Sequence, residues 1–167
     1  HDNPLASTVL SKAMSMVRSY TRQYPALSKP GLLLVGPPGV GKTHLAAAAL
    51  RLLVARGHEG IFFDYQNLLD RIRSGFNETL GGSNREAYQS ALETELLLLD
   101  DLGAHRVTEW VEDTVTSIIT YRCNHKKAFL ATTNLPDPDL GGMLAEKSSV
   151  PGAHSYRTTL VERIGER

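Results

Sequence analysis

The chain has 167 residues, about the length of one ordinary domain, and 41% of them are hydrophobic, which is enough for a packed core. These values argue against intrinsic disorder and against a machine of several domains. Eighteen basic residues balance eighteen acidic ones. No net charge therefore draws the chain to a polyanion or a membrane surface, and any contact with nucleic acid has to be local.

The sequence carries no signal for membrane insertion, export or cross-linking. Its apolar stretches are shorter than the roughly 20 residues that span a bilayer, and its first residues lack the basic and apolar regions of a signal peptide. Cys123 is the single cysteine, and the six histidines do not have the spacing of zinc ligands. We expect a soluble, cytoplasmic protein whose fold rests on packing.

Short apolar runs alternate with helical patterns, which predicts βαβ units, a mostly parallel sheet and a fold of the α/β class. The apolar runs have the composition of strands that helices cover on both faces. In chain order the patterns predict a helix over 7–20, a strand over 32–35, a helix over 41–56, a strand over 60–64, helices over 66–74 and 85–95, a strand over 96–100, a helix over 108–124, a strand over 128–132 and a helix over 156–167.

Local signals accompany several of these boundaries. Gly57 is expected as a left-handed cap after the helix over 41–56, and Thr108 as the N-cap of the helix over 108–124. The apolar face of that last helix is predicted to contain Val111, Val115, Ile118 and Ile119. The glycine-containing segment 76–83 indicates a turn, and the aperiodic segment 136–154 indicates a mobile loop.

The segment 36–43, Gly-Pro-Pro-Gly-Val-Gly-Lys-Thr, fits the pattern G-x-x-x-x-G-K-S/T between an apolar strand and a helix. Its glycines let successive backbone N–H groups turn toward phosphate oxygens, and the helix N-terminus adds partial positive charge. Lys42 is expected to reach the β- and γ-phosphates, and the Thr43 hydroxyl to bind magnesium. The alternative is a glycine-rich turn that binds nothing. The predicted nucleotide-binding residues are Gly36, Pro37, Pro38, Gly39, Val40, Gly41, Lys42, Thr43 and His44.

A second signal joins a buried strand to two carboxylates. Four leucines occupy 96–99, and Asp100 and Asp101 follow them directly. Ligands of open α/β sheets bind at the carboxyl ends of the strands. We therefore expect Asp100 to hold magnesium, directly or through water, and Asp101 to orient and polarise the attacking water as a general base. The alternative is a core strand that ends in an Asp-containing turn.

A third, weaker signal is the polar end of the run Ala131-Thr132-Thr133-Asn134. Asn134 follows a buried strand and is expected to hydrogen-bond the γ-phosphate or the lytic water. The alternative is that Asn134, which precedes Leu-Pro, caps a turn. The predicted catalytic residues are accordingly Asp101 and Asn134, and the predicted metal ligands are Thr43 and Asp100.

Together these motifs resemble the AAA+ ATPases, with a Walker A motif at 36–43, a Walker B motif at 96–101 and a sensor 1 asparagine at Asn134. More narrowly, Gly-Val-Gly-Lys-Thr-His-Leu-Ala, Leu-Leu-Leu-Asp-Asp-Leu-Gly and Thr-Thr-Asn-Leu-Pro are similar to the DnaC/DnaI replicative helicase loaders and the related IstB transposition helper ATPases. The resemblance covers most of the chain. The Asp-Asp pair, in place of the usual Asp-Glu, is tolerated in that group.

The resemblance implies a three-layer P-loop NTPase core of the AAA+ type with strand order 5-1-4-3-2. It implies that ATP or ADP binds with Mg²⁺ at a subunit interface, so that the chain self-associates. It also implies that single-stranded DNA and a hexameric replicative helicase are the partners. An arginine finger, a fifth strand and a sensor 2 arginine are implied beyond residue 167, so we expect 1–167 to be one AAA+ ATP-binding domain without its C-terminal end.

Several basic residues are candidates for further roles. Arg163 and Arg167 are candidates for a trans-acting guanidinium at the γ-phosphate of a neighbouring subunit, with a solvated helix face as the alternative. Candidates for DNA contact are Arg71, Arg73, Arg85, Arg122, Lys126 and Lys127, with Phe76 and Tyr88 as nearby stacking platforms. A solvated helix surface is the favoured interpretation of these basic residues, and packing or an interface is favoured for Trp110.

The sequence therefore predicts an ATP-binding and ATP-hydrolysing module of a helicase loader, with slow, assembly-dependent hydrolysis. A transposition helper ATPase is the alternative within the same chemistry. A nucleotide-dependent binding switch with negligible turnover is the alternative from another class.

Overall fold

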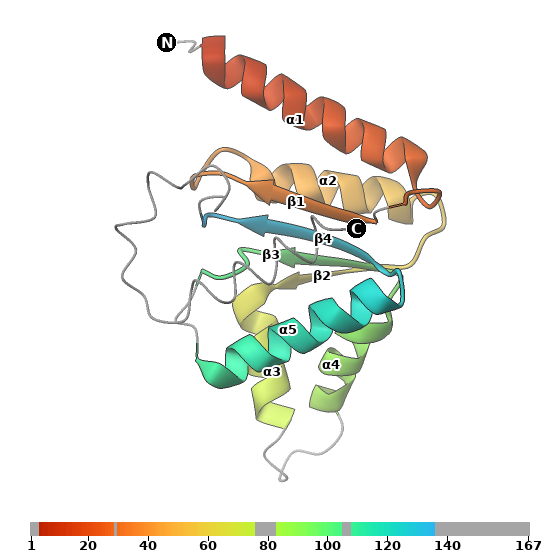
Figure 1. Ribbon diagram of the computed structural model, residues 1–167, viewed down its shortest axis with the longest axis vertical. Coiled ribbons are helices and arrows are strands. Elements are labelled where there is room, and N and C mark those ends of the chain that lie inside the picture. Colours follow the sequence, from red (N-terminus) through yellow and green to blue (C-terminus); the bar gives the residue numbers. More distant parts are fainter. Residues whose placement is uncertain (1–3, 29, 76–82, 105–107, 136–167) are drawn as a thin grey trace.

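Helices cover both faces of one four-stranded parallel sheet in the computed structural model (Figure 1). The structure describes residues 4–28, 30–75, 83–104 and 108–135. The elements in chain order are α1 (Pro4–Gln23), β1 (Gly31–Val35), α2 (Lys42–Val54), β2 (Gly60–Asp64), α3 (Tyr65–Gly75), α4 (Ser83–Glu93), β3 (Leu96–Asp100), α5 (Glu109–Asn124) and β4 (Ala128–Thr133).

The strands lie in the order β1-β4-β3-β2, and every neighbouring pair is parallel. This is the predicted order for the four strands that the described residues contain. Because all four strands point the same way, the segments that follow β1, β3 and β4 leave the sheet at one edge (Figure 1). The α/β class and the P-loop type of arrangement are thus confirmed.

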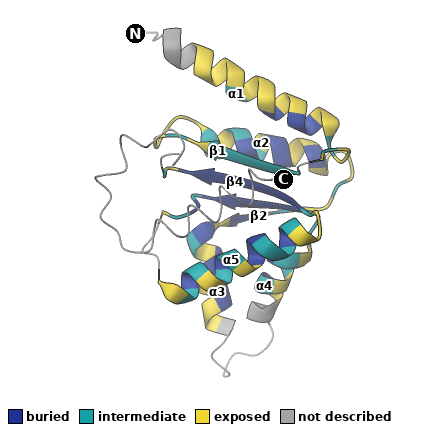
Figure 2. Cartoon of the chain, viewed as in Figure 1, coloured by how far each residue is buried: buried dark blue, intermediate teal, exposed yellow. Residues whose placement is uncertain are grey.

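The central strands β3 and β4 are buried along their whole length (Figure 2). Side chains of a strand alternate between the two faces of a sheet. Leu97 and Leu99 pack with α3, α4 and α5, whereas Leu96 and Leu98 pack with α2 and with Val17 and Tyr20 of α1. The run of four leucines therefore supplies both halves of the core, as expected for a strand covered on both faces.

Most predicted boundaries agree with the structure to within a few residues. The strands over 60–64 and 96–100 match β2 and β3. Helix α2 ends at Val54, and Gly57 then adopts a left-handed φ of 93°, while the N–H of His58 donates to the carbonyl of Leu53 at 3.3 Å. Thr108 caps α5 through a 3.4 Å bond from the N–H of Val111. The predicted segments 76–83, 136–154 and 156–167 lie wholly or almost wholly outside the described residues.

The C-terminal end of α1 is fastened to the rest of the fold by polar contacts. The Tyr20 hydroxyl donates to the carbonyl of Pro30 at 2.9 Å, and the Arg56 guanidinium donates to the carbonyl of Thr21 at 2.5 Å. The Tyr24 hydroxyl donates to Oε1 of Glu95 at 2.8 Å, directly before β3. These contacts tie α1 to the start of the sheet, at the edge opposite the loops that follow the strands.

Candidate active site

Three strand ends bring the predicted site residues to one edge of the sheet. The loop 36–41 follows β1, Asp100 and Asp101 stand at the end of β3, and Asn134 directly follows β4. In the sheet, β4 lies between β1 and β3, so the residue after β4 has the loop on one side and the carboxylates on the other. This edge is where open α/β sheets bind ligands.

The loop between β1 and α2 depends on two left-handed glycines. Gly39 has φ 81° and Gly41 has φ 91°, values that residues with a side chain rarely adopt. Gly41 is also the N-cap of α2, and no side chain caps the helix there. The first N–H groups of α2 thus lack a side-chain acceptor, and an uncapped helix N-terminus suits an anion.

Lys42, the first residue of α2, connects the loop to the end of β4. Its ammonium donates to the carbonyl of Pro37 at 2.9 Å and to Oδ1 of Asn134 at 2.5 Å. The amide nitrogen of Asn134 in turn donates to Oδ1 of Asp101 at 3.4 Å. Lys42, Asn134 and Asp101 therefore form one chain of hydrogen bonds, although they come from three separate motifs of the sequence.

The two aspartates at the end of β3 differ in exposure and backbone conformation. Asp100 is 7% exposed, and its Oδ1 accepts a 2.5 Å hydrogen bond from the hydroxyl of Thr132. Asp101 is half-buried and has a left-handed φ of 54°, which is uncommon for a residue other than glycine. Asp100 is thus fixed against β4, and the chain turns at Asp101 toward Asn134.

The remaining predicted residues lie at the start of α2. Thr43 and His44 are exposed in its first turn, and Pro37, Pro38 and Val40 are exposed in the loop. Among the described residues, no hydrogen bond joins Thr43 to Asp100. The structure thus brings Lys42, Asn134 and the aspartates together, and leaves the Thr43 hydroxyl open to solvent.

The donor set suits a hard cation that keeps part of its water. A carboxylate and a hydroxyl are oxygen ligands of the kind that Mg²⁺ takes in phosphate sites. In the described part of the chain, no three His, Cys, Asp or Glu side chains are grouped so that they could hold a metal. Thr43 and Asp100 therefore fit Mg²⁺ if phosphate and water supply the other ligands.

One residue of this edge was missed by the sequence interpretation. Thr132 is fully buried, and its hydroxyl also accepts a 3.0 Å bond from the backbone N–H of Asp101. A hydroxyl residue near the end of an apolar strand was visible in the sequence, but its partners are visible only once β3 and β4 are paired.

Arg122 was wrongly grouped with the exposed basic residues. It is 0% exposed, and burial lowers the pKa of its guanidinium to about 10, against opposing effects of Tyr24 and Cys123. The guanidinium donates to four backbone carbonyls, at the end of α4 and the starts of β3 and β4: Ala91 at 2.8 Å, Leu92 at 3.2 Å, Glu95 at 3.0 Å and Ala128 at 2.5 Å. Arg122 is therefore a structural residue and cannot contact DNA.

The other basic candidates have varied surroundings. The Arg71 guanidinium carbon lies 5.9 Å from the centroid of the Phe63 ring, and that of Arg73 lies 4.9 Å from the centroid of Trp110, which packs on the core as expected. Lys127 donates to the carbonyl of Glu93 at 2.6 Å. Lys126 is exposed. The side chain of Arg85 lies outside the described part of the structure, as do Phe76, Arg163 and Arg167. Contact with DNA stays a prediction.

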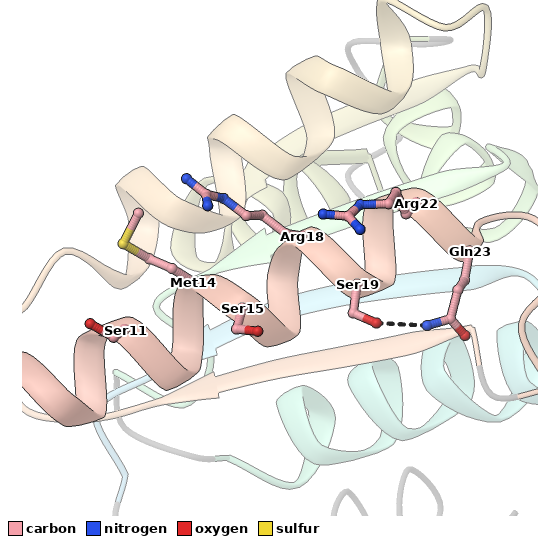
Figure 3. A pocket seen from close by; sticks show the side chains of 7 residues that line it. All are labelled: Ser11, Met14, Ser15, Arg18, Ser19, Arg22 and Gln23. Atoms are coloured by element: carbon pink, nitrogen blue, oxygen red, sulfur yellow. Dashed lines mark hydrogen bonds between the residues drawn. The ribbon is translucent and has the colours of Figure 1, made fainter.

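Two cavities are lined by none of the predicted nucleotide-binding, metal-binding or catalytic residues. One cavity, of about 580 Å³, lies along α1. Arg18, Arg22 and Met14 line it and project from the same side of the helix (Figure 3). The other, of about 570 Å³, lies at the outer strand β2 and is lined by residues of β2, α3 and α4 that include Phe62, Arg71 and Glu86. No described helix is long and apolar enough to cross a membrane.

Comparison with known proteins agrees with this geometry. Residues 21–151 match the family described as IstB-like ATP binding protein. The replicative helicase loader DnaC of Escherichia coli K12 is 23% identical over 135 residues, which are 81% of this chain and 54% of that protein. A protein of insertion sequence IS5376 of Geobacillus stearothermophilus is 26% identical over 136 residues, which are 81% of this chain and 50% of that protein.

A solved structure resembles the chain over most of its length. The crystal structure of the DnaC helicase loader matches with a TM-score of 0.70 and 32% identity, over 92% of this chain and 81% of that one. The chain spans about half the length of the two relatives above.

Proposed function

The chain belongs to the IstB-like ATP binding proteins, and from this premise we propose that it is the ATP-hydrolysing AAA+ module of a replicative helicase loader. In this proposal the module binds ATP with Mg²⁺, self-associates through the nucleotide site, and acts on single-stranded DNA and a hexameric helicase. The likeness to a solved DnaC loader at 32% identity supports the choice of client. The observation that carries the proposal is the hydrogen-bonded chain of Lys42, Asn134 and Asp101 at one sheet edge.

The loop 36–41 and the first turn of α2 hold the phosphates in this proposal. Left-handed Gly39 and Gly41 let the backbone N–H groups face an anion, and the uncapped end of α2 adds its partial positive charge. Lys42 gives up its bond to Asn134 and binds the terminal phosphates instead. Thr43 and Asp100 hold Mg²⁺, which when bound neutralises charge that develops on the phosphates.

Hydrolysis then depends on two residues that flank the terminal phosphate. Asp101 orients the attacking water and accepts its proton, and Asn134 holds the water or a γ-phosphate oxygen through its side-chain amide. The hydrogen bond from Asn134 to Asp101 supports this assignment, because it holds the two groups next to each other. An arginine from a neighbouring subunit completes the site, so turnover is slow until subunits assemble.

Calorimetry on the full-length protein tests the binding step. ATP is expected to bind the wild type, while Lys42→Ala abolishes binding and Asp101→Asn retains binding but stops hydrolysis. Equal ATP affinity in the wild type and in Lys42→Ala would refute the site. Lys12→Ala is a matched control, because Lys12 is an exposed lysine of α1.

Turnover as a function of protein concentration separates a catalyst from a binding switch. If subunits supply residues to each other, the ATPase rate rises more than linearly with protein concentration, and single-stranded DNA raises it further. Tight binding with flat, near-zero turnover under both conditions favours the switch.

A transposition helper ATPase is the second candidate, because a protein of insertion sequence IS5376 matches a similar share of the chain as the DnaC loader does. The chemistry at the nucleotide site is the same in both candidates. Pull-downs with purified replicative helicase and with purified transposase, each with and without ATP, distinguish them. ATP-dependent retention of helicase supports the loader, and retention only of a transposase supports the helper.

A further inference from the structure

Thr132 contacts both Asp100, the last residue of β3, and Asp101, which follows it. Its side chain is fully buried, and its hydroxyl donates to Oδ1 of Asp100 at 2.5 Å and accepts from the backbone N–H of Asp101 at 3.0 Å. Its carbonyl accepts a third bond, from the N–H of Leu102 at 2.8 Å. One residue of β4 therefore holds three consecutive residues at the end of β3.

The hydrogen bonds determine where the hydroxyl hydrogen points. A hydroxyl has one hydrogen to donate, and its lone pairs accept. The N–H of Asp101 can only donate, so it takes a lone pair and leaves the hydrogen for Asp100. The bond fixes the Asp100 carboxylate through Oδ1, and no described residue donates to its other oxygen, which stays open to a cation or its water.

The same contacts stabilise the turn at Asp101. Its φ of 54° lies in the left-handed region, which is unfavourable for residues that carry a side chain. The backbone N–H of Asp101 donates to the Thr132 hydroxyl, and the N–H of Leu102 donates to the Thr132 carbonyl. Without the hydroxyl, the first of these two restraints on the direction of the Asp101 side chain is lost.

We infer that Thr132 is a positioning residue that sets Asp100 for the metal and Asp101 for the attacking water at the same time. The inference rests on the proposed function, because it assigns a role within that site. Thr132 touches neither nucleotide nor water in this role and acts only through the two aspartates. A hydrogen bond to a ligating carboxylate typically contributes about 10- to 100-fold to metal affinity or activity.

The next residue offers a matched control. Thr133 is also buried, at 6% exposed, and its hydroxyl donates to the carbonyl of Leu102 at 2.7 Å and accepts from the N–H of Leu135 at 3.1 Å. It therefore links the same two strand ends without touching either carboxylate. Thr132→Val and Thr133→Val remove equivalent buried hydroxyls, and Thr132→Ser keeps the hydroxyl.

The test measures ATP affinity by calorimetry, with Mg²⁺ and with EDTA, and kcat in the full-length protein. Thr132→Val is expected to leave ATP affinity in EDTA unchanged. The factor by which Mg²⁺ increases ATP affinity should fall about 10-fold, and kcat should fall about 100-fold. Thr133→Val and Thr132→Ser are expected to stay close to the wild type in both quantities. A purely structural role predicts instead that Thr132→Val and Thr133→Val behave alike, and that result overturns the inference.

Failure of the proposed function gives a different pattern, because the wild type then shows no ATP binding in any buffer.

Hydrogen exchange on the nucleotide-free wild type covers the case in which Thr132→Val does not fold. The Asp101 N–H is expected to exchange as slowly as the amides within β3. Exchange as fast as that of an exposed loop would show that the Thr132 contact does not hold, and would equally overturn the inference.

Discussion

The ammonium of Lys42 lies 2.5 Å from Oδ1 of Asn134, although 92 residues separate them in the chain. The cation that is predicted to bind phosphate is thus paired with the residue that is predicted to sense it. ATP has to replace this contact, so the properties of the residue at 134 should alter ATP affinity as well as hydrolysis.

We expect different effects on ATP affinity from two variants of Asn134. Asn134→Asp places a carboxylate beside Lys42 and the phosphates, and should weaken ATP binding by about 10-fold, or 1.4 kcal/mol. Asn134→Ala removes the competing acceptor and should leave ATP affinity within about threefold, while hydrolysis falls about 100-fold because one polar group at the transition state is missing. Calorimetry and single-turnover hydrolysis measure the two effects. Equal affinity of the two variants would contradict the Lys42 contact.

Arg122 is expected to dominate stability among the basic residues. Arg122→Leu removes a donor from four backbone carbonyls, of which those of Ala91 and Ala128 lie in buried contacts, and should lower the free energy of unfolding by about 3 kcal/mol or more. Arg122→Lys should be intermediate, because one ammonium cannot reach all four carbonyls. Urea denaturation measures the change. Lys126→Ala, at an exposed position with left-handed φ, is the basic-residue control for lost charge, and a loss as large as that of Arg122→Leu would contradict this account.

Glu95 should make part of the stability depend on acid pH. Partial burial raises the pKa of its carboxyl group, but bonds from the Tyr24 hydroxyl, the N–H of Glu59 and the His58 ring outweigh this and leave the pKa below its usual value. A carboxyl group whose pKa is lower in the folded protein stabilises the fold above its unfolded pKa, and this contribution disappears as the pH falls through the folded value.

The corresponding measurement is the melting temperature of the wild type and Glu95→Gln from pH 7 to pH 3. The wild type should melt higher at neutral pH, and the difference should shrink as the pH falls below the usual glutamate pKa of 4.5. Asp113→Asn, at an exposed position of α5, is the control for lost charge. A difference that stays constant over the whole range would show that the charge of Glu95 has no part in it.

Gly60, the first residue of β2, should not tolerate a side chain. A Cβ there would lie 2.6 Å from Cδ1 of Leu50 and 3.1 Å from Cγ2 of Val54, so the side chains of Leu50 and Val54 would have to shift. Gly60→Ala is expected to lower the free energy of unfolding by about 1–3 kcal/mol. Leu50→Val shortens the side chain that clashes, so the double variant should lose less than the sum of the single variants. Simple additivity would mean that the contact is not responsible.

Much of the sheet and of the site could be predicted because the signals are local in the sequence. The leucine run and the glycine loop each identify an element from a few neighbouring residues. The contact between Lys42 and Asn134 could not be predicted in this way, since it depends on β4 lying beside β1. The aspartate contacts of Thr132 depend similarly on the pairing of β3 with β4.

Arg122 shows a different reason for failure. Its neighbours Lys126 and Lys127 indicate an exposed basic cluster, and that interpretation rests on the charge of Arg122 and not on its position on the helix. Yet Arg122 follows Ile118 by four residues and so lies on the apolar face that had been predicted for the same helix. The sequence contained this signal, but a cation on a buried face is acceptable only when carbonyls are there to receive it, and those carbonyls come from other elements.

The uniform composition of β3 has a consequence for how the sheet is aligned. Four consecutive leucines look the same from either face, so sliding β3 along β4 by one position would exchange leucine for leucine, and apolar patterning alone cannot prevent the slip. Polar contacts at the two ends of this strand pair can prevent the slip. The Arg122 guanidinium donates to the carbonyls of Glu95 and Ala128 at one end, and the Thr132 hydroxyl donates to Asp100 at the other. The alignment of β3 with β4 therefore depends on these two polar contacts and not on the leucines between them.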